Sequence, residues 1–543
     1  MDFSTLLIVL LGAPLVATLI MAILPSKYTS RSIYVFIHIL AFLSVLVLGL
    51  YLAANVFLGN EIFALSNWLH IDALSAIFVA LIAVIASATG LHAIGYIGGD
   101  AKAGKLDNAK VKLFYTLFSL FMFTMLLAVL SNNIVMTWIS VEATTLSTVF
   151  LVGLYRDKLS LEAAWKYIIV CTVGVAFGLY STVLVYSNAV NVLADPHEAA
   201  FWTSIIPHAS QFDPQLMRIA FVFAVIGFGT KAGIFPMSTW LPDAHSEAPA
   251  SVSALLSSVL LKCAVFVIIR YYSFVIPSTG DAFPQTILLV LGGLSIVVSA
   301  FTIYTQHDLK RKLAYHSVEN IGIIVFCLGI GGSIGIMAAL LHCVAHGFTK
   351  ALLFCISGDL QHIYKTRDTA KITGILRIAP LTAVMFALGL FALSGLPPFA
   401  MFISETTMFF AGVDAGLIWL IVIVAIALTV VMAAIFQLAI KGIFNAPPEG
   451  TKKERPPITS LAAELALLAV VAGFIVALPG MGYNGFQSAT YEALPDQALS
   501  EQSLAGQQSE QSLNGRQQTE QTLTNQQQDS ALGKIFVLDN SNE

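Results

Sequence analysis

The hydrophobic pattern of this chain consists of long apolar runs separated by short polar segments. Runs of about 20 apolar residues, the length that a helix needs to cross about 30 Å of hydrocarbon, occur about fourteen times. Their centres lie near residues 15, 45, 84, 121, 144, 177, 226, 259, 295, 322, 345, 393, 427 and 468. The pattern predicts an all-α fold, a polytopic membrane bundle of about 14 transmembrane helices.

The order of the runs predicts five parts of the chain. Helices 1–3 occupy residues 1–110, a first five-helix unit (helices 4–8) residues 111–275, a second unit (helices 9–13) residues 284–441, and a last helix residues 458–480. Residues 481–543 are Gln-rich and polar. Such a composition cannot bury enough apolar surface to offset chain entropy, so we expect a disordered tail; a helical strap docked on a partner is the alternative.

The two five-helix units contain a weak internal repeat. Glu142, preceded by valine and followed by an apolar stretch to Gly153, is matched by Glu319 with its stretch to Gly329. Five spans separate the two copies, and an odd number of crossings reverses the orientation of the second copy. Inverted repeats of this kind place a transport site near the bilayer midplane.

Both units also contain a helix that the sequence interrupts. The seventh run carries Gly233 and Pro236, and the twelfth carries Gly395, Pro397 and Pro398. Proline removes a backbone donor and clashes with the preceding turn, so helices 7 and 12 should be broken. Within a membrane, the freed carbonyls must face protein or water. These breaks are therefore candidate resting places for an ion.

Basic residues alternate between successive connections. Odd-numbered loops carry Lys27 and Arg31, Lys102 to Lys110, Arg156 and Lys158, Lys310 to Lys312, Lys365 and Arg367, and Lys452 to Arg455, whereas even-numbered loops carry almost none. This bias places the odd-numbered loops in the cytoplasm and both termini outward, in the inner (cytoplasmic) membrane of the cell. The Lys310-Arg311-Lys312 cluster is better explained by this topological role than by ligand binding.

Composition excludes several other classes of protein. Hydrophobic residues make up 57% of the chain and charged residues only 11%, against about 25% in soluble domains. The net charge of −4 leaves no basic footprint for nucleic acid. All five cysteines fall in apolar runs without a CxxC pair, so we expect no iron–sulfur or zinc site, no cofactor and no metal in this chain. No nucleophile constellation is evident, and any redox centre must belong to a partner.

Seven ionisable residues interrupt the apolar runs. A charge in hydrocarbon costs about 3 kcal/mol even on lenient scales, so such residues usually face the bundle interior and mark an ion pathway. They predict proton translocation, with no catalytic group in the covalent sense. The seven are Glu142, Lys231, Lys262, His342, His346, Lys350 and Glu405.

Structural explanations for these residues stay open. Residues 342, 346 and 350 recur at intervals of four and share one helix face, which suits a relay, a hydrogen-bonded cluster or, through the histidine pair, zinc. No third zinc ligand with suitable spacing is evident, and Lys350 would repel the cation. Lys231 and Lys262 could instead extend their ammonium groups to the interface, and Glu142 could be a neutral, hydrogen-bonded acid.

A polar loop follows the seventh run and has two interpretations. Asp243 and Ser246 could cap the helix that follows, whose first amides lack partners. Its other polar residues could admit protons from the cytoplasm, and Glu319 could do the same or pair with a lysine of residues 310–312. The candidate uptake residues are His245, Glu247 and Glu319.

Several motifs are familiar. The stretch KAGIFPMSTWLPDAHSEAP from Lys231, the sequence LLKC around Lys262, the stretch HDLKRKLAYHSVEN from His307, and residues 342–354 resemble the antiporter-like, proton-pumping membrane subunits of respiratory complex I. The same family includes membrane-bound hydrogenases and Mrp cation/proton antiporters. The resemblance covers about residues 70–440, and the form of the first motif is most similar to the hydrogenase 4 component F branch.

The resemblance implies a role for each matching position. Glu142 and Lys231 would form the switching ion pair of the family, and Lys262 would be a central proton carrier. Glu405 would be the terminal carrier. His342, His346 and Lys350 would connect the two carriers.

The resemblance implies a proton-translocating membrane subunit of a redox-driven complex, either complex I-like (NADH:quinone oxidoreductase) or membrane-bound hydrogenase-like. Its partners would be other membrane subunits, a hydrophilic redox arm and the lipid bilayer. The electrostatic mechanism is that Lys231 keeps its proton while an ionised Glu142 is close and releases it toward Lys262 when that partner is withdrawn. A cation/proton antiporter subunit of Mrp type and the membrane subunit of an inorganic-carbon uptake complex are the alternatives.

Overall fold

The computed structural model describes residues 2–451, 453–477 and 483–494. Helices dominate this part of the chain, and two short strands, β1 (Ile62–Ala64) and β2 (Leu69–Ile71), form an antiparallel hairpin in which Phe63 lies opposite His70. The polar tail was predicted to begin at residue 481, but residues 483–493 form helix α20, which contacts α3 and α14. The rest of the predicted tail, residues 495–543, lies outside the described residues.

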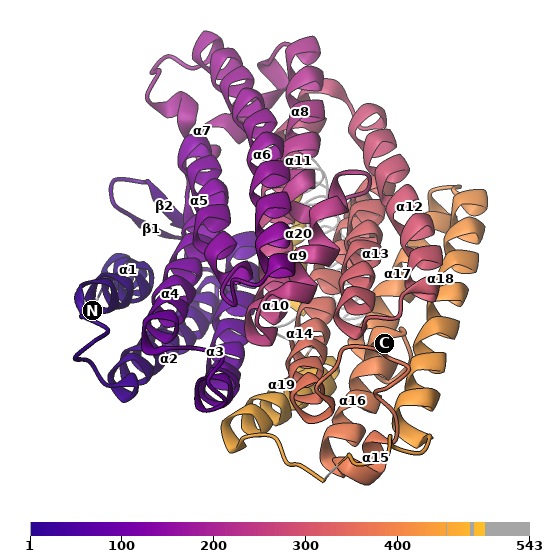
Figure 1. The fold of residues 1–543 in the computed structure, drawn as a ribbon. Helices are drawn as coiled ribbons and strands as arrows, with labels where there is room; N and C mark the ends of the chain where they lie inside the picture. The colour runs from indigo at the N-terminus through magenta and orange to yellow at the C-terminus, as the bar shows by residue number, and fades with distance from the viewer. Residues whose placement is uncertain (1, 452, 478–482, 495–543) are drawn as a thin grey trace, which may run out of the picture. The chain divides into compact units, whose positions relative to one another are not determined.

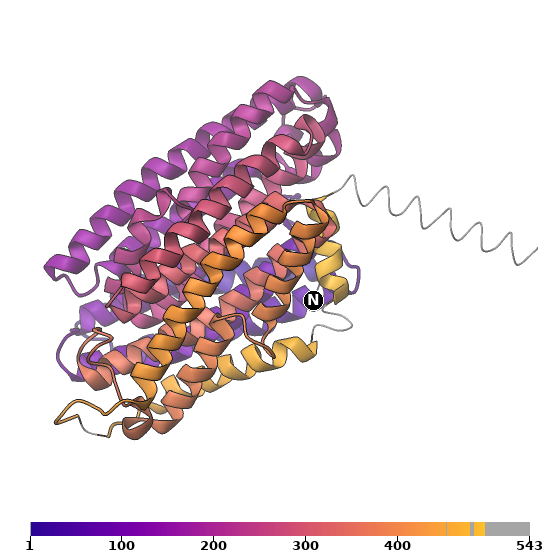
Figure 2. The ribbon, with the colours of Figure 1, turned by 90° about the vertical axis from the view of Figure 1, so that its right-hand side faces the viewer.

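Thirteen described segments are long and apolar enough to cross a membrane. Ten are single helices: α1 (Phe3–Ile23), α2 (Arg31–Phe57), α3 (Ala73–Lys102), α4 (Asn108–Leu130), α5 (Ile134–Val152), α6 (Lys158–Val192), α12 (Ala282–Thr305), α13 (Leu309–Ile330), α14 (Gly332–Tyr364) and α19 (Ile458–Ala477). They run side by side through the bundle (Figures 1 and 2).

The other three long segments are composite. They are α8 (Pro214–Ala232) with η3 (Met237–Trp240) and α9 (Leu241–Glu247); α10 (Ala250–Leu255) with η4 (Leu256–Leu260) and α11 (Leu261–Thr279); and α18 (Ile418–Ala439) with η5 (Ile440–Phe444). The apolar helix α16 (Pro380–Leu393) is shorter and is followed by α17 (Ala400–Asp414), so the described residues contain thirteen long apolar segments where about fourteen were predicted. Short connecting turns are η1 (Glu198–Ala200), α7 (Trp202–Ile205), η2 (Ile206–Gln211) and α15 (Ile375–Ile378). The predicted fold class, a polytopic helical membrane bundle, is confirmed.

Both predicted helix breaks are present. The chain leaves α8 at Gly233 with φ +81° and leaves α16 at Gly395 with φ +64°, left-handed conformations that favour glycine. At the first break, the Trp240 indole donates to the Thr230 carbonyl at 2.9 Å and the Phe235 amide donates to Ser295 Oγ at 3.0 Å. The backbone groups released by the break are thus bonded to protein, as the hydrocarbon surroundings require. The inverted relation of the two units stays a prediction.

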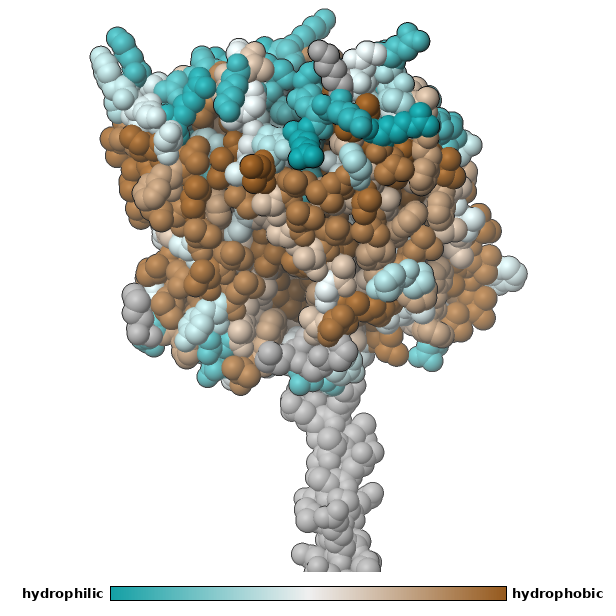
Figure 3. All heavy atoms as spheres, turned by 90° about the horizontal axis from the view of Figure 1, so that it is seen from below, coloured by the Kyte–Doolittle hydropathy of each residue, from teal (hydrophilic) through white to brown (hydrophobic). Residues whose placement is uncertain are grey.

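The loops with basic residues meet at one end of the bundle. The Asn108 side chain donates to the carbonyls of Ser26, at the end of α1, and Thr29. Tyr155 donates to Asp100 at 2.6 Å, which joins the loop after α5 to the end of α3. In Figure 3 hydrophilic side chains gather along one edge of the visible face, above a broad hydrophobic belt. These contacts agree with the alternation of basic loops read from the sequence.

Glycines set the closest helix crossing in the first unit. A Cβ added at Gly227 of α8 would lie 2.6 Å from the Cα of Gly178 on α6, and one at Gly174 would lie 2.5 Å from the Thr230 side chain. The two backbones therefore touch without intervening side chains. This contact holds α8, and with it Lys231, against α6.

We predict that Gly227→Ala lowers the melting temperature, because overpacking a tight contact costs about 1–3 kcal/mol. Thermal unfolding of the detergent-solubilised protein measures the effect. Gly98→Ala on α3 is the matched control, since no atom lies within 4 Å of its added Cβ, and this variant should melt at or above the wild-type temperature. Equal melting temperatures for the two variants would contradict the assigned contact.

Candidate functional site

Lys231 lies at the end of α8, just before the break, and only 1% of it is exposed. Its Nζ donates to Thr145 Oγ1 and to the Tyr167 hydroxyl, both at 2.7 Å, and lies 4.8 Å from the centre of the Tyr167 ring. Because Tyr167 accepts from the lysine, its own proton is directed to Thr148 at 2.6 Å. The ammonium is therefore held by neutral oxygen atoms in the interior of the bundle.

The expected direct ion pair between Glu142 and Lys231 is absent among the described residues. No nitrogen–oxygen contact within 4.0 Å joins the two side chains there, and Glu142 instead accepts from Thr172 of α6 at 3.0 Å. The Glu142 side chain is half-buried, and its second oxygen has no hydrogen-bond partner. Glu142 and Thr145 are one turn apart on α5, so the carboxylate acts on Lys231 through its field and through Thr145. The sequence motif alone could not show whether the Glu142 and Lys231 side chains touch.

Lys262 begins the central part of the site. It is fully buried and follows the π-turn η4, and its Nζ donates to the Ser257 carbonyl and to His346 Nδ1, both at 2.7 Å. A π-turn shifts the backbone register by one residue, which brings the Ser257 carbonyl within reach of the ammonium. The hydrogen bond to His346 joins α11 to α14.

The predicted stripe on α14 continues from His346. The rings of His342 and His346 stack nearly in parallel, with centroids 6.2 Å apart. His342 Nδ1 lies 2.9 Å from Ser404 Oγ of α17, and its Nε2 lies 3.0 Å from Asn320 Oδ1 of α13. Because the amide oxygen of Asn320 only accepts, His342 carries its proton on Nε2 and can accept at Nδ1.

Glu405 adjoins Ser404 and lies against the second helix break. A Cβ at Gly395 would be 2.9 Å from Glu405 Oε1, so the carboxylate occupies the space that a side chain at residue 395 would fill. The structure thus aligns Lys262, His346, His342, Ser404 and Glu405 across α11, α14 and α17. Sequence reasoning predicted four of these five; Ser404 and the neighbouring Asn320 are uncharged and gave no hydropathy signal.

Lys350 and Glu319 form a side branch on α13 and α14. The Lys350 ammonium donates to the Leu313 carbonyl and lies 5.1 Å above the Phe354 ring. Glu319 is buried, accepts from Asn320, and lies 3.8 Å from His316 Nδ1. The predicted alternative that Glu319 pairs with a lysine of residues 310–312 is therefore wrong, because α13 turns it inward, toward the stripe.

The polar loop after the first break lies at the basic end. His245 is fully buried on α9, with Nδ1 bonded to the Leu241 carbonyl at 2.8 Å and Nε2 without a partner. Glu247 accepts from Arg367 at 2.9 Å, and Arg367 also pairs with Asp308 at 3.1 Å. Burial tends to lower the pKa of Arg367, but Asp308 and Glu247 raise it overall. Glu247 thus marks the aqueous end and His245 the interior.

The capping role suggested for Asp243 is wrong. The residue before α10 is Pro249, which has no side-chain cap, and Asp243 lies inside α9. Asp243 instead pairs with Lys166 of α6 at 3.0 Å and with Arg311 of α13. The carboxylate therefore fastens the broken helix to both of its neighbours.

A second polar site lies at the opposite end of the bundle, where α3 begins. Arg270 and Asp72 form a buried ion pair beside a cavity of about 280 Å³, which His70 and Glu492 also line. Burial tends to raise the pKa of Asp72, but Arg270, His70 and the Ser75 amide bring it down to about 2. Burial raises the pKa of Glu492 on α20 to about 7. No sequence pattern indicates this site, because Arg270 and Glu492 are far apart in the chain.

A model of the transmembrane family "NADH:quinone oxidoreductase/Mrp antiporter" matches residues 131–431. The match covers more than half of the chain and includes every residue of the aligned polar path. The chain belongs to this family. It is an antiporter-like membrane subunit of the group that contains complex I, hydrogenase and Mrp proteins.

Two relatives illustrate the range of the family. The hydrogenase-4 component F homolog of Methylacidiphilum infernorum is 37% identical over 335 residues, which are 62% of this chain and 70% of the relative. Subunit A1 of a Na(+)/H(+) antiporter from Staphylococcus aureus is 31% identical over 372 residues, 64% of this chain. The aligned part spans only 44% of that antiporter subunit.

Solved structures share the fold at lower identity. Chains of an archaeal membrane-bound sulfane sulfur reductase and of the Mrp complex from Dietzia align with TM-scores of 0.77 and 0.78, at 22% and 19% identity. The alignments cover 90% and 91% of this chain and 97% and 98% of the matched chains. Complex I from Thermus thermophilus aligns with a TM-score of 0.73 at 20% identity, covering 90% of this chain and 99% of that one. Each is a multisubunit membrane assembly, in agreement with the predicted membrane-subunit partners.

We predict that the stability of the bundle falls between about pH 4.5 and pH 7 because of Glu492. The folded protein holds this proton up to a pKa of about 7, whereas the unfolded chain releases it near pH 4.3, so raising the pH across this window favours unfolding. Glu492→Gln should flatten this part of the melting temperature–pH curve. Glu449→Gln in the exposed loop after η5 is the control and should leave the curve unchanged.

Proposed function

We propose that this chain moves protons across the membrane as a subunit of a redox-driven complex of the complex I or membrane-bound hydrogenase type. The observation that carries the proposal is the polar path formed by Lys262, His346, His342 and Ser404, with Glu405 next to Ser404 on α17. Lys262 bonds to His346, the His342 ring stacks on the His346 ring, and Ser404 lies 2.9 Å from His342. These four residues are buried in the bundle interior, and Glu405 is half-buried. Protons can move along such a row of polar side chains without a charge entering the lipid.

The first step is uptake at the basic end. Glu247 is held at this end by Arg367, and His245 lies farther in with a free Nε2. Basic loops mark the cytoplasmic side in membrane proteins, so uptake would occur from the cytoplasm across the inner membrane. Both termini of the chain would then lie on the outward side.

The second step is the switch at Lys231. Within the described part of the chain, the ammonium is held by Thr145, Tyr167 and the aromatic ring alone, so its charge depends on the field of the half-buried Glu142. Neutralising that carboxylate, or covering it with a neighbouring subunit, leaves an isolated charge in the interior and favours proton release toward α11. A carboxylate on the rim of the bundle is well placed to respond to a partner.

The third step is transfer along α14. When Lys262 gives its proton to His346 Nδ1, His346 must release the proton on Nε2 to return to a neutral ring. The stacked His342 ring is too distant for a direct bond, so one water would bridge the rings. Ser404 lies 2.9 Å from His342 Nδ1, and Glu405 follows it on α17 beside the second break, so a further water would carry the proton from His342 to Glu405.

The redox chemistry belongs to other subunits in this proposal. The five cysteines are separate buried thiols, and the sequence prediction that this chain carries no cofactor remains a prediction. A hydrophilic arm would supply the electron-transfer energy, which reaches this chain through its membrane neighbours.

We predict that Lys231→Ala reduces proton flux to background while the subunit still assembles. The substitution removes the only group on α8 that can carry the proton at this position. Flux is measured with a pH-sensitive dye in vesicles containing the whole purified complex. Lys102→Ala, which changes an exposed lysine at the end of α3, is the control and should pump normally. Normal pumping by Lys231→Ala would remove Lys231 from the mechanism.

We predict that Ser404→Ala slows proton flux about tenfold, because it removes the hydrogen bond to His342, which is worth about 1–1.5 kcal/mol. Thr407→Val, one turn away on α17, removes a hydroxyl that bonds only to the Ile403 carbonyl and should retain normal flux. Equal flux in the two variants would mean that protons leave His342 by another route.

The same vesicles distinguish the second candidate function. The 31% identity to a Na(+)/H(+) antiporter subunit favours a cation/proton antiporter of Mrp type as the alternative. Sodium-dependent proton exchange that continues without an electron donor would support the antiporter. Proton uptake that needs the donor and ignores sodium would support the redox-driven pump.

A further inference from the structure

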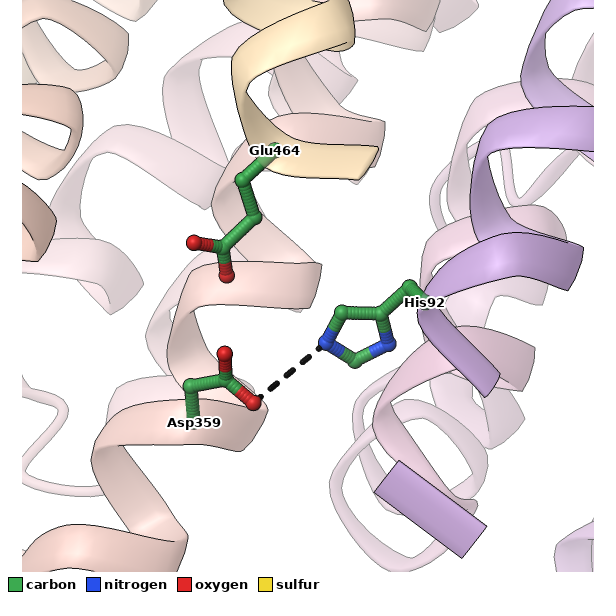
Figure 4. Close-up of side chains that lie close together, drawn as sticks. All are labelled: His92, Asp359 and Glu464. Atoms are coloured by element: carbon green, nitrogen blue, oxygen red, sulfur yellow. Dashed lines mark ion pairs between the residues drawn. The ribbon is translucent and has the colours of Figure 1, made fainter. Parts of the chain in front are cut away.

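Three ionisable side chains that the proton path does not use meet between α3, α14 and α19 (Figure 4). They are His92, Asp359 and Glu464, and each is at most 1% exposed. His92 Nε2 lies 3.5 Å from Asp359 Oδ1, and one ligand atom from each of the three residues lies within 4.8 Å of the others.

The three side chains are unsatisfied as they stand. Both ring nitrogens of His92 and all four carboxylate oxygens of Asp359 and Glu464 are buried without a hydrogen-bond partner. Within the described part of the chain, no lysine or arginine nitrogen forms an ion pair with either carboxylate. The imidazole of His92 supplies a counter-charge to Asp359 only when it carries a second proton, and two ionised carboxylates beside a neutral imidazole in an apolar interior are strongly unfavourable. The site therefore requires a cation, either as a metal or as added protons.

We propose that His92, Asp359 and Glu464 bind a divalent transition-metal ion of the Zn²⁺ or Mn²⁺ class. One imidazole and two carboxylates are typical ligands for these ions, whereas Ca²⁺ and Mg²⁺ prefer more ligands that are all oxygen. A divalent cation also neutralises the two carboxylates completely. A single proton would leave one negative charge buried.

The ligand distances fit such an ion with a small adjustment. Zinc–nitrogen and zinc–oxygen bonds of about 2.0–2.2 Å place tetrahedral ligand atoms about 3.4 Å apart. The separation of His92 Nε2 and Asp359 Oδ1 is close to this value, at 3.5 Å. A rotation of the Glu464 side chain would bring the third ligand in, and a water would complete the shell. Ser460 Oγ, one turn before Glu464 and buried without a partner, could bond to that water.

Close packing holds the three helices in register at the site. A Cβ at Gly95, one turn after His92, would lie 2.6 Å from Thr459 Oγ1 and 2.9 Å from Ser460 Oγ. The start of α19 therefore rests directly on α3. The metal would fasten α19, of which only 28% is buried, to the rest of the bundle.

Polar groups connect the site to the basic end. Tyr96 stacks on His92 on one side and on His362 on the other, with ring centroids 5.6 and 4.2 Å apart. His362 lies 3.2 Å from Asp100, which also pairs with the half-exposed Lys105 at 3.0 Å. These side chains link the site to the basic end through polar and aromatic contacts.

The test is the metal content of the purified full-length protein in mild detergent. After incubation with Zn²⁺ or Mn²⁺ and removal of free metal, elemental analysis of folded wild-type protein should find one ion per chain. Asp359→Asn and Glu464→Gln should each reduce occupancy at least tenfold. His38→Gln, which changes another buried histidine with an unpartnered nitrogen, is the control and should retain the ion. X-ray absorption should show a mixed nitrogen and oxygen shell near about 2.0–2.1 Å.

Two outcomes would overturn the proposal. One is wild-type protein without bound metal whose infrared spectrum shows a protonated-carboxyl band that disappears in Glu464→Gln, which would mean that protons satisfy the site. The other is undiminished metal in both carboxylate variants, which would place the ion elsewhere. If one variant does not fold, the other decides the matter. None of these readouts depends on proton pumping, so the result is separate from the proposed function.

Discussion

Every buried charge in this bundle needs a partner inside the protein, because the surrounding hydrocarbon supplies none. The lysines meet this requirement largely with backbone carbonyls. Lys262 donates to Ser257, Lys350 to Leu313 and Lys310 to Ala248. The π-turn before Lys262 and the Pro249 break after Ala248 alter the regular pattern beside two of these acceptors. Leu313 lies within the regular helix α13, where its carbonyl oxygen offers a second lone pair to Lys350.

Neutral acceptors differ from carboxylates in what they allow a lysine to do. A salt bridge of ideal geometry would hold the proton of Lys231 firmly. Hydroxyl groups hold it weakly enough for a distant charge to determine whether the lysine is protonated. The same reasoning applies to Lys262, whose partner His346 can accept the proton itself. Neutral contacts surround the buried lysines, whereas ion pairs such as Arg270 with Asp72 occur elsewhere in the bundle, beside the start of α3.

The same fold occurs in other membrane assemblies. The fold is shared with chains of a sulfane sulfur reductase, an Mrp complex and complex I. Glu142 is half-buried, so part of its side chain can face a neighbouring subunit.

The sequence by itself predicted a helical membrane bundle and its two helix breaks, because hydropathy and proline act locally along the chain, and it supplied the charged candidates for the path. Only the tertiary structure decided their partners. Glu142 and Lys231 proved not to touch, Asp243 proved to join three helices rather than cap one, and Asn320 and Ser404 joined the path. The His92, Asp359 and Glu464 cluster was equally invisible, since its residues lie far apart in the chain. Which side chains meet depends on helix rotation and crossing geometry, and glycine contacts such as Gly178 with Gly227 fix these only when the whole bundle is packed.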